Sequence, residues 1–301
     1  MRDYRSIWLY LHDVEHRLGY ADAGGIRTRY LEAGNPENPP LLLLHGTAGS
    51  IENFCANIRA YAQDFHVFAI DMLGCGRTEK PDYPYVITLY AKHARDFLAT
   101  MGIARASIVG VSLGSWVAAR MALDFPGLVD RFVMVAPAGI VVSSERVAEF
   151  VASMRKRRSS AADDPTWDSI TTVFKHLVLN EEDIIDDLVA IRLSIYSNPE
   201  MKRAMPHLLE ASKGEGRLTD DEWRSLPNPV LAVAAIDKDD IFLDNARRIG
   251  ELVPNVQVIE IPNCDHWAQF EQADAFNRVS IAFLKGEPIP AAIARSETIG
   301  G

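Results

Sequence analysis

The chain of 301 residues is long enough for one large α/β domain or for a core with an inserted subdomain. Hydrophobic residues make up 48% and charged residues 24% of the chain, a composition typical of globular proteins. The formal net charge of −10 argues against non-specific nucleic-acid binding and against docking on an anionic membrane.

The three cysteines, Cys55, Cys75 and Cys264, are widely separated, odd in number and without C-x-x-C spacing. Reduced thiols in a cytoplasmic protein fit this usage best. The apolar run at 7–11 is too short and too quickly followed by charges for a signal peptide, and no run is long enough to cross a bilayer. Residues 3–17 predict a short amphipathic extension that could form an oligomer contact, with a homodimer as the expected form.

Strand and helix patterns alternate along the chain. Two alternating segments separated by glycine, residues 16–25 and 26–34, predict a β-hairpin. Apolar runs of strand length, typical of strands buried on both faces, follow at 39–46, 66–74, 106–112, 130–137, 228–237 and 256–262. Helical stretches lie between them at 52–63, 86–101, 113–125, 243–253 and 270–284. This order predicts a mainly parallel sheet with helices on both sides.

The alternation stops between Pro137 and Pro227, where every segment has a helical period. We therefore expect a helical cap at residues 140–224, inserted after the sixth strand, and a core formed by residues 1–139 and 225–301. The one basic run, residues 154–158, is expected to form a solvated helix face and not a binding patch.

The stretch Gly110-Val-Ser112-Leu-Gly114 follows a short apolar strand and precedes a helical segment. A sharp strand-to-helix turn would expose the serine hydroxyl at the bend, and small residues two before and two after it would let the neighbouring backbone approach. An ordinary turn with incidental glycines is the alternative. The pattern makes Ser112 the candidate nucleophile.

A serine nucleophile needs an imidazole to take its proton and a carboxylate to orient that imidazole. Ligands of an open parallel sheet bind at the carboxyl ends of its strands, so the residues that follow each strand are the candidates. His266 is the one histidine that follows a late strand and lies downstream of the candidate acids. The carboxylates of Asp237, Asp239 and Asp240 follow the preceding strand. Counting back from the start of the next helix favours Asp239 as the acid over Asp237, and Asp240 is the third choice.

The loop after the first parallel strand, His45-Gly-Thr47-Ala-Gly-Ser, is rich in small residues. Its Thr47 N–H, together with the N–H of Leu113, is expected to face the oxyanion of the reaction. Asp71 follows another strand end and is expected to tie down its own turn through backbone N–H groups, without acting as the acid.

Together these residues resemble the α/β-hydrolase fold superfamily over nearly the whole chain. The resemblance rests on LLLLHGTAGS, DMLGCGRTEKPD, GVSLGS, DKDDIFLDNARRI and CDHWAQFEQADAFN. It implies an eight-stranded sheet flanked by helices. The last motif and the DMLGCGRTEKPDYPY turn are similar to meta-cleavage product hydrolases, which split a carbon–carbon bond in 2-hydroxy-6-oxo-hexa-2,4-dienoates formed during degradation of aromatic compounds.

The resemblance implies three substrate-binding residues. Arg192 stands where the family holds the substrate's carboxylate end, Asn53 resembles an asparagine of the polar subsite, and Trp267 would shape the pocket beside the histidine. A guanidinium on an apolar cap helix can hold a carboxylate or enolate bidentately. The alternative is an exposed helix arginine paired with Asp186 or Asp187.

Three departures bear on the reaction. The family's oxyanion loop usually contains Gly-Pro-Gly where this chain has Thr47-Ala-Gly49, and Val111 and Ser115 replace an asparagine and a glycine around the nucleophile. The predicted function is hydrolysis of a C–C bond beside a ketone in a small-molecule substrate, with no metal or organic cofactor. Val111 and the altered loop favour a carboxylesterase or lactonase as the alternative, and a ligand receptor of the hydrolase fold is a third hypothesis.

Overall fold

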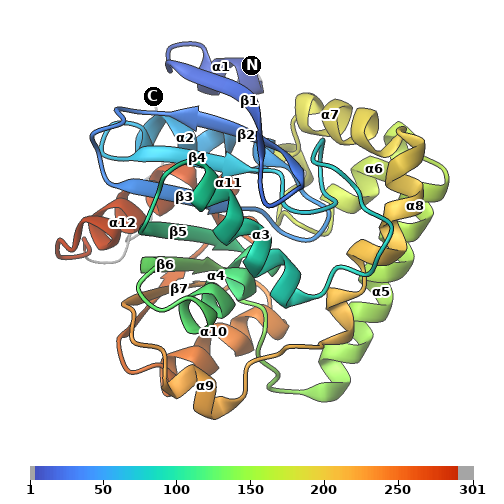
Figure 1. Ribbon diagram of the computed structural model, residues 1–301. Helices are drawn as coiled ribbons and strands as arrows, with labels where there is room; N and C mark the ends of the chain where they lie inside the picture. The colour runs from blue at the N-terminus through green and yellow to red at the C-terminus, as the bar shows by residue number, and fades with distance from the viewer. Residues whose placement is uncertain (1–3, 291–301) are drawn as a thin grey trace, which may run out of the picture.

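The computed structural model describes residues 4–290 (Figure 1). One sheet of eight strands runs through the molecule in the order β1-β2-β4-β3-β5-β6-β7-β8. The strands are β1 (His16–Asp22), β2 (Arg27–Ala33), β3 (Pro40–Leu44), β4 (His66–Ile70), β5 (Ala106–Val111), β6 (Val129–Val135), β7 (Val230–Ala235) and β8 (Val256–Ile261).

The pairing of the strands confirms the predicted hairpin and the mainly parallel sheet. β1 pairs antiparallel with β2, and β2 pairs antiparallel with β4, whereas all other neighbours are parallel. The central strands are apolar because helices cover both faces, and Leu41–Leu44 of β3 are fully buried. The polar residues that follow these strands are thereby gathered at one edge of the sheet.

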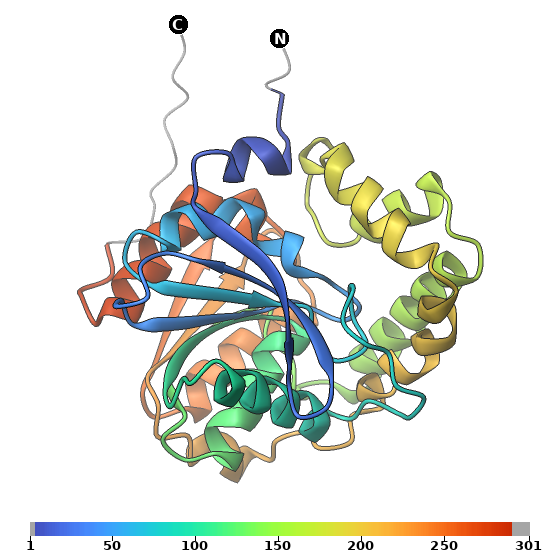
Figure 2. The ribbon, with the colours of Figure 1, turned by 45° about the horizontal axis from the view of Figure 1, so that its top comes forward.

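Helices cover the two faces of the sheet (Figures 1 and 2). α3 packs against α4 on one face, and α2, α11 and α12 pack together on the other. The core helices are α1 (Ile7–Leu11), the 3₁₀ helix η1 (Ile51–Phe54), α2 (Cys55–Tyr61), α3 (Ile87–Thr100), α4 (Leu113–Asp124), α10 (Ile241–Leu252), α11 (Ala268–Glu271) and α12 (Ala273–Lys285).

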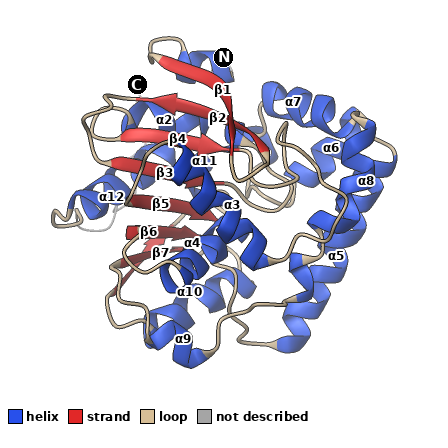
Figure 3. Ribbon diagram, in the orientation of Figure 1, coloured by secondary structure: helices blue, strands red, loops and turns tan. Residues whose placement is uncertain are grey.

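The segment between β6 and β7 contains no strand in the structure (Figure 3). It forms α5 (Ser144–Asp163), α6 (Trp167–Phe174), α7 (Asp186–Tyr196), α8 (Pro199–Leu208) and α9 (Asp220–Arg224), with short 3₁₀ turns at Glu181–Asp183 and Ala211–Lys213. α5 to α8 contact one another at the side of the sheet, and we call these four helices the cap. α9 instead packs against α10, so the end of the segment predicted as cap lies on the core.

The N-terminal segment forms the short helix α1, with Ser6 as its N-cap (residue 3 lies outside the described residues). Trp8 is 68% exposed and Leu9 is 45% exposed, so this helix presents apolar side chains to solvent. Within residues 4–290, no helix combines the length and the apolar character that crossing a bilayer would require.

Candidate active site

A cavity of about 600 Å³ lies between the carboxyl ends of the central strands and the cap. Its volume is within the range usual for small-molecule sites. The core contributes Thr47, Asn53, Ser112, Asp240, His266 and Trp267 to its lining, and the cap contributes Met154, Arg157, Arg158 and Arg192.

Ser112 occupies the bend between β5 and α4 with φ 52° and ψ −112°, a conformation that non-glycine residues rarely adopt. A Cβ on Gly114 would collide with the carbonyl oxygen of Leu44, and a Cβ on Gly110 would collide with the carbonyl of Gly114. Both glycines are therefore required by close backbone approach. The bend exposes Ser112 to the cavity.

Ser115 supports this bend from the first turn of α4, a role that no sequence pattern indicates. Its hydroxyl donates to the carbonyl oxygen of Ser112 over 2.6 Å and accepts from the N–H of Ala138 over 3.0 Å. The N–H of Ser112 itself donates to the carbonyl oxygen of Val135 over 2.8 Å. The serine is thus fixed from both sides.

Among residues 4–290, the backbone N–H groups of Thr47 and Leu113 beside Ser112 donate no hydrogen bond, and neither does that of Gly114. Leu113 begins α4, and the first N–H groups of a helix have no partner within it. Thr47 lines the cavity directly after Gly46, where a Cβ would lie 3.4 Å from the Cβ of Ser112. Free donors at these positions could stabilise an oxyanion on a group bound at Ser112.

The loop that carries Thr47 is held by His45. One ring nitrogen of His45 lies 2.7 Å from the carbonyl oxygen of Gly46, and the other accepts from the N–H of Met72 over 3.0 Å. Burial lowers the pKa of His45 to about 3, so the ring is neutral. A neutral ring can donate from one nitrogen and accept at the other.

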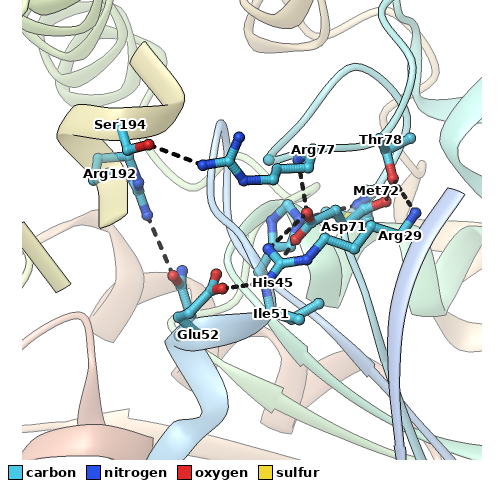
Figure 4. Close-up of polar contacts among 12 residues, drawn as sticks. Arg29, His45, Ile51, Glu52, Asp71, Met72, Arg77, Thr78, Arg192 and Ser194 are labelled. Atoms are coloured by element: carbon cyan, nitrogen blue, oxygen red, sulfur yellow. Dashed lines mark hydrogen bonds and ion pairs between the residues drawn. The ribbon is translucent and has the colours of Figure 1, made fainter. Parts of the chain in front are cut away.

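Asp71 ties down its own turn, as predicted. Its carboxylate accepts from the N–H groups of Arg77 and Ile51 over 2.7 and 2.8 Å (Figure 4). It also pairs with Arg29 over 3.3 Å, and Arg29 pairs in turn with Glu52 over 2.7 Å. The positive charge of Arg29 is therefore balanced by two carboxylates.

His266 is buried in the cavity wall, with its ring edge-to-face against Phe242 at 4.3 Å between centroids. Burial lowers the pKa of His266 to about 4, with Arg158 and Lys238 acting in the same direction and Asp265 opposing them. The ring is therefore neutral near pH 7, the form that a general base requires. Among residues 4–290, no hydrogen bond joins this ring to Ser112 or to a carboxylate.

The structure does not bring Asp239 to the cavity. The side chain of Asp239 is 86% exposed and lies 3.4 Å from Arg146. Asp240 lines the cavity instead, and its Oδ1 accepts from the N–H groups of Phe242 and Leu243 as the N-cap of α10. The N-cap position turns Asp240 inward, and the residue before it faces solvent.

Asp237 also lies away from the cavity lining, where its carboxylate accepts from the N–H of Asn263 over 2.6 Å. Burial raises the pKa of Asp240, and its two backbone N–H donors oppose that rise. Of the three candidate acids, Asp240 is the one that shares the cavity with Ser112 and His266.

Arg192 on α7 is buried, so the alternative of an exposed helix arginine is wrong. Its Nη2 donates to Oδ1 of Asn53 over 3.2 Å, and its guanidinium lies 5.2 Å from the ring centroid of Phe174. Figure 4 shows this guanidinium reaching from the cap toward η1, the 3₁₀ helix that carries Glu52. Burial lowers the pKa of Arg192, and no carboxylate within the described residues forms an ion pair with it.

Trp267 lies beside His266 and is buried against the cap. Its ring meets Phe174 edge-to-face at 5.4 Å, and the backbone N–H of Trp267 donates to the carbonyl oxygen of Leu177 over 3.0 Å. It thereby joins the loop after β8 to the cap at the cavity wall.

The basic run on α5 was predicted to be a solvated face, and this is wrong for part of it. Met154 and Arg158 are buried, and they line the cavity together with the half-buried Arg157. Packing of α5 against α6 and α8 turns this side of the helix inward.

In residues 4–290, no three His, Cys, Asp or Glu side chains are grouped as a metal site would need.

Residues 39–273 match the model of the alpha/beta hydrolase fold family, so the chain belongs to that family. It is 28% identical to 2-hydroxy-6-oxo-6-(2'-aminophenyl)hexa-2,4-dienoic acid hydrolase of Metapseudomonas resinovorans, over 88% of this chain and 90% of the relative. It is 26% identical to 2-hydroxymuconate semialdehyde hydrolase of Pseudomonas putida, over 87% and 92% of the two chains.

The structure superposes on a serine hydrolase involved in carbazole degradation with a TM-score of 0.77 at 28% identity, covering 91% of this chain and all of that one. The family and the names of these relatives support hydrolase activity, and they confirm the predicted resemblance to meta-cleavage product hydrolases.

Proposed function

We propose that the protein hydrolyses a C–C bond beside a ketone in a 2-hydroxy-6-oxo-hexa-2,4-dienoate, as part of the degradation of aromatic compounds. The observation that carries this proposal is Arg192, a buried arginine that has no carboxylate partner among residues 4–290 and lies in the same cavity as Ser112 and His266. An uncompensated buried cation is costly unless an anion binds beside it. The carboxylate end of a dienoate is such an anion.

In the proposed reaction, Arg192 and Asn53 hold the dienolate end while its C5 carbon takes up a proton and the ketone form results. His266 then removes a proton from Ser112, or from a water molecule, as the oxygen attacks the C6 carbonyl carbon. The N–H groups of Thr47 and Leu113 stabilise the oxyanion.

The C5–C6 bond breaks when the oxyanion collapses, and its electron pair leaves as an enolate that a proton quenches. When Ser112 is the nucleophile, a water molecule then hydrolyses the acyl ester on Ser112 and releases the carboxylic acid. Overall, water adds across the bond: the hydroxyl ends on C6 as a carboxylic acid and the hydrogen on the dienoate fragment. We assign the orienting carboxylate to Asp240 in place of Asp239, because Asp240 lines the cavity with His266 and Asp239 does not.

The test is ultraviolet–visible spectroscopy of the purified protein with a panel of ring-fission dienoates. The yellow chromophore of at least one should bleach, and Ser112→Ala should abolish the bleaching. If no member of a broad panel bleaches, the proposal is wrong.

Ester or lactone hydrolysis by the same residues is the second candidate. It is favoured by Val111, a buried apolar residue where a polar contact to the dienoate would be expected from the resemblance. Fast turnover of aryl esters by both the wild type and Arg192→Ala, with no dienoate consumed, would decide for it.

We also propose a homodimer that buries the N-terminal helix, because Trp8 and Leu9 present apolar surface there and β1 is an edge strand. Sedimentation of the wild type and Trp8→Glu would test it.

The three cysteines are free and buried, which supports the predicted reduced thiols and a cytoplasmic location.

A further inference from the structure

A second buried arginine faces the cavity beside Arg192. Arg158 of α5 is 7% exposed and lines the cavity, and its Nε has no hydrogen-bond partner in the part of the chain that the structure describes. Its Nη1 approaches the hydroxyl of Tyr196 at 3.5 Å, the limit of a hydrogen bond. Arg158 therefore sits in the cavity with most of its donors unused.

The two arginines converge on one residue. Tyr196 lies one turn after Arg192 on α7, with its ring centroid 5.9 Å from the Arg192 guanidinium carbon, and its hydroxyl contacts Arg158. Nε of Arg192 also lacks a partner among the described residues. Two guanidinium groups with free N–H donors thus share one region of the cavity.

Nothing within residues 4–290 neutralises this pair. Glu149, Asp240 and Asp265 line the same cavity, but no ion pair joins any of them to Arg158 or Arg192. Asp265 is paired with Lys238 instead. Arg29, by contrast, is neutralised by two carboxylates. This contrast indicates that the anion that balances Arg158 and Arg192 comes from a ligand.

The charge and the spacing limit the ligand. Two neighbouring guanidinium groups match a head group with two adjacent anionic sites, because each planar guanidinium can bind a pair of oxygens. The proposed substrate offers such a head group when its 2-hydroxyl has ionised: a carboxylate on C1 and an enolate oxygen on C2. Arg158 would also supply the polar contact that Val111 cannot make.

We propose that Arg158 and Arg192 form a two-arginine subsite that binds the substrate as the enolate dianion, with Arg158 on the enolate oxygen. This inference rests on the proposed function and deepens it by naming the ionised form that is bound.

The first experiment measures kcat and KM for 2-hydroxy-6-oxohepta-2,4-dienoate in the wild type, Arg158→Met, Arg192→Met and Lys156→Met, the last removing an exposed cation from the same helix. Arg158→Met should raise KM at least tenfold and Lys156→Met less than twofold. The loss of kcat/KM in Arg158→Met should be several times larger for the dienoate than for p-nitrophenyl acetate, which has no anionic head group. Equal losses on both substrates, or an unchanged KM for the dienoate, would overturn the proposal.

The second experiment reads the ionisation directly. In Ser112→Ala the bound dienoate persists, and its absorbance reports the enolate. Removing Arg158 in the Ser112→Ala, Arg158→Met double variant should raise the pH at which the bound enol ionises by at least one unit, because a neighbouring cation favours the anion. Arg158→Lys in the same background should restore part of the shift, and an unshifted titration would contradict the assignment.

A failure of the proposed function is distinguishable from a failure of this subsite. If the wild type consumes no dienoate, the proposed function is wrong, and oxalate, which carries two adjacent carboxylates, then tests the subsite by thermal shift. Oxalate should raise the Tm of the wild type and of Lys156→Met but not of Arg158→Met. Equal stabilisation of all three proteins would overturn the subsite.

Discussion

Arg192 on the cap donates a hydrogen bond to Asn53 on the core over 3.2 Å, and this bond joins two segments separated by 139 positions along the chain. Both side chains are buried and both line the cavity. The bond fixes the guanidinium in the cavity wall, and it uses one of the five N–H donors of the arginine. The remaining donors are available to a ligand.

Replacing Asn53 should therefore weaken binding of the dienoate without harming the chemistry of simple esters. We expect Asn53→Ala to raise KM for 2-hydroxy-6-oxohepta-2,4-dienoate about tenfold, since a hydrogen bond to a charged group contributes about 1.5 kcal/mol. Turnover of p-nitrophenyl acetate serves as the control. Additive effects of Asn53→Ala and Arg192→Met in a double-mutant cycle would show that the two residues act independently, contrary to this expectation.

The second prediction separates two adjacent carboxylates. On the proposed assignment, Asp240→Asn should lower kcat by about 10²- to 10⁴-fold, because the histidine would lose the carboxylate that orients it. Asparagine is also a good N-cap, so α10 should remain folded. Asp239→Asn, at an exposed side chain, should change kcat less than twofold. A larger loss in Asp239→Asn than in Asp240→Asn would return the role to Asp239.

The features of this structure that the sequence predicts are those that depend on interactions between residues close together along the chain. The strands and the bend at Ser112 depend on local patterns, apolar runs and a glycine on each side, and these were predicted correctly. The choice between Asp239 and Asp240 depends on a single helix N-cap, which shifts the inward-facing side chain by one position. The inward side of α5 depends on packing against α6 and α8, which no local pattern of charges reveals, and so the burial of Arg158 in the cavity wall is not predicted.

The third prediction concerns the bend itself. Gly114→Ala would place a methyl group against the backbone carbonyl of Leu44, which cannot move without disturbing the central strand β3. We expect a loss of about 3 kcal/mol in the free energy of unfolding, and a Tm lower by about 5 °C. Gly127→Ala is the matched control, because its Cβ would meet nothing within 4 Å and only its φ of 87° adds strain, about 1 kcal/mol. Similar Tm values for the two variants would contradict the predicted close approach.

The fourth prediction is a loss of stability in acid. Burial lowers the pKa of His93 to about 4, and one ring nitrogen lies 2.7 Å from the hydroxyl oxygen of Thr28. The unfolded chain binds a proton on this ring near pH 6.5 but the folded chain only near pH 4, so the free energy of unfolding falls as pH decreases through this window.

His93→Gln should therefore lose about 3 kcal/mol less than the wild type between pH 7 and pH 4, measured by urea denaturation at each pH. His12→Gln replaces an exposed histidine and should follow the wild type. If the curves of the wild type and His93→Gln are parallel, the buried ring does not contribute to the acid sensitivity.

The last prediction concerns the group on the far side of the scissile bond. A side pocket of about 80 Å³ lies against Ser112, Thr47 and Leu113, and apolar side chains that include Ile140 and Val147 line it. A pocket this small suits a short alkyl group better than a phenyl ring. Dienoates with a methyl or isopropyl group on C6 should therefore show kcat/KM at least tenfold above that of the phenyl compound.

Enlarging the pocket should change this order. Ile140→Ala removes apolar volume at the pocket wall and should raise kcat/KM for the phenyl compound relative to the methyl compound. Ile170→Ala removes the same volume from a fully buried site on α6 outside the cavity lining, so it should lower stability without changing the ratio. A wild type that prefers the phenyl compound would mean that the distal group binds elsewhere in the larger cavity.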